Sequence, residues 1–139
     1  MNTVATFVTE QFNTTVTKPT FINPGCFGDD LALWLGEELR TEGFSVGGNP
    51  VAEDFGWAVS FDVKKRRFWA VIGYVPGNGW YIALERRGPM AMFFRRFRDI
   101  PDDAIDAVKR VLVRGADIRD LQWHSARDFF KGLPVAGSP

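Results

Sequence analysis

Residue types that usually build metal and redox sites are scarce in this chain of 139 residues. Cys26 is the single cysteine, which excludes a disulfide within the chain and a zinc site built on several thiolates. His124 is the single histidine, and no loop carries the alternating acids of a calcium site. We therefore expect no metal and no cofactor. The sequence contains no catalytic constellation either, so it assigns no catalytic residue and favours a non-enzymatic protein.

Long apolar runs are also absent, since no stretch approaches the roughly 20 residues that cross a bilayer. The first 16 residues, MNTVATFVTEQFNTTV, lack the positive and continuous apolar regions of a signal peptide. These observations predict a cytoplasmic protein. Its 45% hydrophobic and 24% charged residues are typical of one globular domain over residues 1–139. Residues 1–20 are predicted to be an N-terminal arm or an edge strand, and residues 132–139 a frayed tail.

The net charge is zero, but the charges are unevenly distributed along the chain. Residues 1–62 contain nine acidic and two basic side chains, whereas residues 63–98 contain nine basic and one acidic. Such asymmetry indicates either separate acidic and basic faces or segments that pair with each other in the fold.

Two segments have the spacing and the boundary residues of helices. Residues 29–42 carry an apolar stripe made of Leu31, Trp34, Leu35 and Leu39. Gly43 is suited to end this helix. Residues 101–115 show the same pattern, with acids at the start and a glycine at the end. A short strand over residues 117–123 and a short helix over residues 124–131 are predicted to follow.

The centre of the chain predicts an antiparallel meander of three strands, over residues 57–63, 67–75 and 80–87. The basic run Lys64–Arg67 and the sequence PGNG predict the two turns. The second and third strands are apolar on both faces, so we expect a cover on the second face. Residues 89–98, the N-terminal arm or another copy of the chain are the candidates. The predicted fold is α+β, with about four to five strands and the two main helices packed on one face.

The segment EDFGW, residues 53–57, raises the question of a ligand cleft. In the simplest interpretation, Glu53 and Asp54 are solvated acids and Gly56 lets the chain turn into a strand. In the alternative, one carboxylate stands at the rim of a pocket walled by Trp57 and receives a cationic group. Adjacent residues of an extended segment point to opposite faces, so the two acids are not expected to form a catalytic pair. Trp57 and Trp80 are expected to be partly exposed.

Basic residues gather in a turn and around a phenylalanine-rich segment. They are Lys64, Lys65, Arg66, Arg67, Arg86, Arg87, Arg95, Arg96 and Arg98. Arginine beside aromatic rings can bind single-stranded nucleic acid through phosphate contacts and stacking. A pI near 6.6 instead favours solvated strand ends that pair with the acidic helix.

Three stretches, FINPGCFGDDLALWLGEEL, EDFGWAVSF and GWYIALERR, resemble a type of small bacterial α+β protein with no assigned activity. Some toxin-immunity proteins are similar in size and in the succession of helix, meander and helix. The resemblance covers about residues 20–125 and carries over no catalytic residue. It implies a non-enzymatic binding role.

The sequence therefore favours a protein-interaction module, in one version immunity-like, that binds a protein partner or another copy of itself and no membrane. It would use its basic surface or an acidic one made of Glu37, Glu38, Glu53 and Asp54. One alternative is a small-molecule-binding protein or enzyme with a pocket near Trp57 and Trp80. Another is nucleic-acid binding through the arginines, which the neutral charge disfavours.

Overall fold

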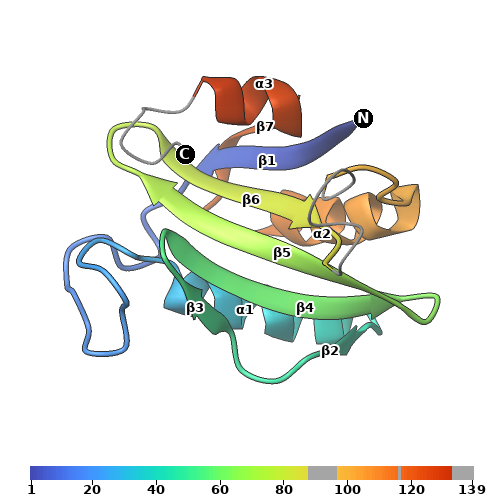
Figure 1. Cartoon of the computed structure of the whole chain (residues 1–139), viewed down its shortest axis with the longest axis horizontal. Coiled ribbons are helices and arrows are strands. Elements are labelled where there is room, and N and C mark those ends of the chain that lie inside the picture. The colour runs from blue at the N-terminus through green and yellow to red at the C-terminus, as the bar shows by residue number, and fades with distance from the viewer. Residues whose placement is uncertain (88–96, 116, 133–139) are drawn as a thin grey trace.

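The computed structural model describes residues 1–87, 97–115 and 117–132. This part of the chain forms one antiparallel sheet of seven strands, with two main helices packed against it (Figure 1). The fold is therefore α+β. The strands are β1 (Asn2–Val8), β2 (Ser45–Val46), β3 (Val51–Glu53), β4 (Gly56–Val63), β5 (Arg66–Val75), β6 (Gly79–Glu85) and β7 (Arg119–Ser125). The helices are α1 (Asp29–Thr41), α2 (Asp102–Arg114) and α3 (Ala126–Lys131).

The predicted meander is confirmed as β4, β5 and β6, which pair antiparallel along their lengths. The sheet order is β2-β4-β5-β6-β1-β7, and β3 also pairs with β4. Only Lys64 and Lys65 form the first turn, because Arg66 and Arg67 already pair within β5. The prediction of four to five strands is too low, since the two short strands at the β4 edge carry no local pattern of their own.

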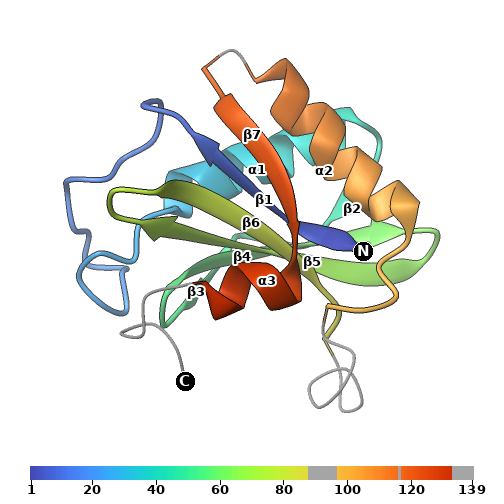
Figure 2. The same cartoon turned by 90° about the horizontal axis from the view of Figure 1, so that it is seen from above.

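The N-terminal segment is an internal strand, which corrects the expectation of an arm or an edge strand. β1 lies between β6 and β7, with Val4 opposite Ala83 on one side and His124 on the other (Figure 2). Val4 and Phe7 are fully buried there. The mixture of threonine with valine and phenylalanine in this segment suggested an edge strand, but both neighbours of β1 are distant in sequence and leave no local signal.

Helix α1 confirms the prediction over residues 29–42 within one residue. Gly43 adopts a positive φ of 97°, and the Phe44 N–H donates to the Leu39 carbonyl, which closes the C-terminus. Phe44 then packs back against the hydrophobic core, with its ring 6.3 Å from that of Phe61. The helix therefore ends where the sequence predicted, for the predicted reason.

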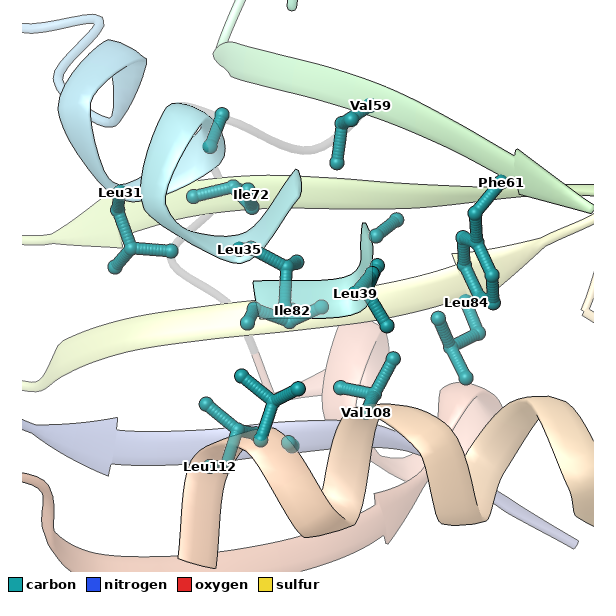
Figure 3. Close-up of a cluster of buried hydrophobic side chains, with 14 of the residues drawn as sticks. Leu31, Leu35, Leu39, Val59, Phe61, Ile72, Ile82, Leu84, Val108 and Leu112 are labelled. Carbon is teal, nitrogen blue, oxygen red and sulfur yellow. The ribbon is translucent and has the colours of Figure 1, made fainter. Parts of the chain in front are cut away.

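Helices α1 and α2 share one core with the sheet, as Figure 3 shows. Leucines from both helices point toward the same strand side chains, among them Phe61, Ile72 and Ile82. The central side chains of this core are 0–2% exposed, so their burial is the main stabilising contribution to the fold.

The second face of the sheet is covered in part by α3, which lies away from α1 (Figure 1). Phe129 and Phe130 pack on Tyr81 and Ala83 of β6, and Phe97 joins them. Phe97 belongs to the predicted covering segment 89–98, of which residues 89–96 lie outside the described residues. The proposed frayed tail lies outside them as well, apart from Gly132.

Candidate functional site

The EDFGW segment forms a tight hairpin at one edge of the sheet. Glu53 ends β3, and Asp54 and Phe55 make the turn into β4. Ala52 lies opposite Trp57 in the ladder, so Glu53, the next residue of β3, projects from the other face. The Glu53 and Trp57 side chains therefore do not line the same cleft.

Trp57 and Trp80 are buried, at 7% and 1% exposure, so the expectation of partial exposure is wrong. The Trp57 indole Nε1 donates a hydrogen bond to the Cys26 carbonyl at 2.8 Å. Gly28, just before α1, packs against both rings: a Cβ built there would lie 3.4 Å from Trp80 and 3.6 Å from Trp57. The loop leading into α1 therefore closes over the two tryptophans and makes them part of the core.

Glu53 is held by an arginine from a segment more than thirty residues away. Arg87 Nη2 lies 2.6 Å from Glu53 Oε1, and Arg87 Nε bonds to Glu85, which is 1% exposed. The guanidinium also stacks over Trp69, 4.4 Å from the ring centroid. Burial acts to lower the pKa of Arg87, but the hydrogen bonds to Glu85 and Glu53 outweigh it and raise the pKa. This arrangement joins an acidic and a basic candidate in one internal cluster.

Apolar side chains are exposed around the turn of the same hairpin. Ile22, Val51 and Phe55 are 53%, 47% and 48% exposed. The Asp54 carbonyl accepts hydrogen bonds from Asn23 Nδ2 at 2.8 Å and from Cys26 Sγ at 2.9 Å, which fixes the loop carrying Ile22 beside the turn. We call Ile22, Val51, Asp54 and Phe55 the tip patch. Among the described residues, the Asp54 carboxylate forms no ion pair.

The remaining acidic candidates lie on α1, away from this hairpin. Glu38 lies 3.5 Å from Arg114 of α2, and Glu42 nearby binds both Arg110 and Arg114. Glu37 is exposed on the same helix. The acids of α1 that face α2 therefore serve to join the two helices.

Most of the described basic candidates have acidic or aromatic partners. Lys64 pairs with Asp103, Arg67 with Asp62, Arg86 with Asp99, and Arg87 with the two glutamates. Arg66 stacks over Phe68 at 5.5 Å, and Lys65 and Arg98 are exposed. Arg95 and Arg96 lie outside the described residues. Asp62 and Glu53 belong to the acidic segment 1–62, so the uneven charge brings the two segments together at Arg67 and Arg87, which was one of its two interpretations.

The sequence did not single out the apolar members of the tip patch or a pocket on the second face of the sheet. That pocket, of about 370 Å³, is lined by Trp80 but by neither Trp57 nor the hairpin acids. Trp80, which was predicted to stand near a pocket, and the single histidine, His124, both line it. Val51 is exposed on the edge strand β3, and Phe55 is exposed in the turn between β3 and β4.

Comparison of the chain with protein-family models, with curated proteins and with solved structures finds no match. No helix in the described part of the chain is long and apolar enough to cross a membrane. Within residues 1–87, 97–115 and 117–132, no group of three or more histidine, cysteine or acidic side chains is placed to hold a metal ion.

Proposed function

We propose that the protein is a non-enzymatic interaction module that binds a protein partner through the tip patch. The observation that carries this proposal is the group of three half-exposed apolar side chains beside one acid, Asp54, that forms no ion pair with the described part of the chain. Clustered apolar exposure of this kind is typical of interaction sites rather than of a free surface. One member of the patch, Val51, lies on β3, which pairs on one side only among the described strands, and an edge strand offers further backbone hydrogen bonds to a partner.

The chemistry of the patch suggests a partner with an apolar surface and a basic group. Phe55 and its neighbours supply apolar area, and the Asp54 carboxylate attracts a lysine or an arginine. An immunity-like role fits this chemistry, because a toxin that is basic around its active site would meet an acidic and apolar tip. We also propose that the protein is cytoplasmic and that it is of the small bacterial α+β type that its sequence resembles.

Binding through the basic candidates is a weaker proposal. Lys64, Arg67, Arg86 and Arg87 have acidic partners within the chain, so a phosphate backbone would have to displace these ion pairs. A pocket at Trp57 is weaker still, because that ring packs in the core. We therefore favour the tip patch over both alternatives.

Affinity purification with four forms of the full chain tests the proposal. The forms are wild type, Phe55→Ser, Asp54→Lys and Val113→Ser. Val113 is 66% exposed on α2 and serves as a matched control for loss of an exposed apolar side chain. A partner that wild type and Val113→Ser retain and that both tip variants lose supports the proposal. The purified partner is then expected to bind Phe55→Ser at least about tenfold more weakly in calorimetry.

Retention of the same partners by both tip variants would contradict the proposal. Thermal unfolding of each variant is the control for stability. Asp54 contributes its backbone carbonyl to the loop contacts, so Asp54→Lys is expected to keep the wild-type unfolding temperature.

A further inference from the structure

A second candidate site lies on the face of the sheet that α3 covers. It is the pocket of about 370 Å³, a volume within the usual range for small-molecule sites. Its walls come from β1, β6, β7, the turn between β5 and β6, and α3. The side chains that matter for recognition are those of Thr6, Tyr81, His124, Asp128 and Phe129. This site is distinct from the tip patch and does not depend on it.

Local contacts fix these side chains before any ligand arrives. His124 Nε2 lies 2.8 Å from Thr6 Oγ1 across the β1–β7 pair, which sets the orientation of the imidazole. Ser125 caps α3 by accepting from the Asp128 N–H, which places Asp128 and Phe129 in the first turn of that helix. The Phe129 ring lies 4.9 Å from the Tyr81 ring and 6.1 Å from that of His124. The Tyr81, His124 and Phe129 rings therefore form one aromatic cluster among the residues that line the pocket.

The charged side chains that line the pocket determine whether a positively or a negatively charged ligand is favoured. Asp128 is exposed at the rim, and it is the only acidic side chain among the described lining residues, which include no lysine or arginine. Arg127 and Lys131 of α3 are exposed and do not line the pocket. Burial raises the pKa of Tyr81 to about 12, so its phenol stays uncharged at neutral pH. The described residues that line the pocket thus carry one fixed charge, the negative charge of Asp128.

We propose that this pocket binds a small organic cation, with the apolar body of the ligand against Tyr81 and Phe129 and its positive centre beside Asp128. A ring face attracts a cation through its quadrupole, and a carboxylate at the rim adds direct attraction. An anion would meet the Asp128 carboxylate instead. A neutral ligand of the same shape would gain only apolar contact.

Choline and its neutral isostere 3,3-dimethylbutan-1-ol are the probes that separate these cases. We expect choline chloride to cause saturable amide shifts in ¹H–¹⁵N spectra at His124, Phe129 and their neighbours. The neutral alcohol is expected to bind at least about fivefold more weakly, and Asp128→Asn to weaken choline binding by a similar factor. Asp106→Asn removes an exposed charge from α2 and should leave choline binding unchanged.

Three results would overturn the proposal. One is that choline chloride shifts the pocket resonances no more than the same concentration of sodium chloride. Another is equal binding of choline and its neutral isostere, and the third is unchanged choline affinity in Asp128→Asn. Phe129→Leu provides a second test, with weaker choline binding expected. If that variant fails to fold, Asp128→Asn decides alone, because its side chain makes no hydrogen bond among the described residues.

Discussion

At the scale of single residues, Gly56, which was expected to let the chain turn into a strand, is constrained by packing. Gly56 begins β4 opposite Gly73 of β5. A Cβ at Gly56 would lie 1.9 Å from the Ile72 carbonyl oxygen, and one at Gly73 would lie 2.4 Å from the Tyr81 ring. The glycine of EDFGW is therefore required by the approach of a neighbouring strand, which the sequence could not indicate.

Gly56→Ala is expected to destabilise the protein by at least about 3 kcal/mol, because a fixed backbone oxygen stands where the methyl group must go. Chemical denaturation measures the difference. Gly48→Ala is the matched control, since a Cβ there meets nothing within 4 Å, and it should change stability by less than about 0.5 kcal/mol. A Gly56→Ala protein as stable as the Gly48→Ala protein would refute this packing account.

Substitution of alanine for Gly36, which is buried inside α1, is expected to stabilise the protein, in contrast to Gly56→Ala. A Cβ there would lie 3.5 Å from Val46 and from Val59, which is ordinary contact. Gly36→Ala should therefore raise the free energy of unfolding by about 1 kcal/mol, through the helix propensity of alanine. A leucine side chain at Gly36 is larger than the available space, so Gly36→Leu should lower the free energy of unfolding by about 1–3 kcal/mol. Calorimetric unfolding of both variants checks the pair, and a loss of stability in Gly36→Ala would show that the space is smaller than described.

At the scale of secondary structure, the turn between β4 and β5 is built from unfavourable residues. Lys64 and Lys65 have φ values of 51° and 66°, which lysine adopts at a cost. A positive φ at both central residues is typical of a type I′ turn, in which glycine is favoured at the second of these positions. Lys65→Gly is expected to stabilise the protein by about 1 kcal/mol, as measured by denaturant unfolding. Lys65→Ala removes the same charge without relieving the backbone, so an equal gain in that variant would contradict the explanation.

The contact between α1 and α2 makes stability depend on pH through Glu42. Hydrogen bonds from Arg110 and then Arg114 lower its pKa below the ordinary value of 4.5. A lowered pKa in the folded state adds stability above the unfolded pKa, and this stability is lost as pH falls through the folded pKa. Glu42→Gln should therefore be less stable than wild type at neutral pH, and the difference should shrink as pH falls below 4.5.

Unfolding midpoints in urea at about pH 7 and about pH 3 measure this difference. Glu37→Gln is the control, because Glu37 is exposed on the same helix and forms no ion pair among the described residues. A Glu42→Gln deficit of the same size at both pH values would contradict the assignment of the lowered pKa to folding.

The sequence predicted the helices and strands whose own residues form a recognisable local pattern. The bounds of α1 and α2 follow from acidic first turns, apolar stripes and glycines at the ends. The meander follows from alternation and two turns. The internal position of β1 and the presence of β2 depend on pairing with strands outside their own stretch of sequence, so no local pattern reveals them. β3 pairs with β4 through a tight turn, but its three residues, Val51–Glu53, are too few to show the alternation of a strand. The exposure of Val51 in the tip patch was missed for that reason.

At the scale of the whole molecule, many of the unevenly distributed charged residues form ion pairs with each other within the fold. The cluster of Arg87 with Glu53 and Glu85 joins the basic segment to the acidic one. Lys64 pairs with Asp103 at the start of α2. Among the described residues the Asp54 carboxylate forms no ion pair, and the proposed function rests on this acid and its exposed apolar neighbours.

The most direct test of this central claim is photocrosslinking in the native host, with a benzophenone amino acid in place of Phe55 or of Val113. We expect a discrete crosslinked product with one other protein from position 55 and none from position 113. If position 55 yields no product, or the same products as position 113, the tip patch is not the interaction surface.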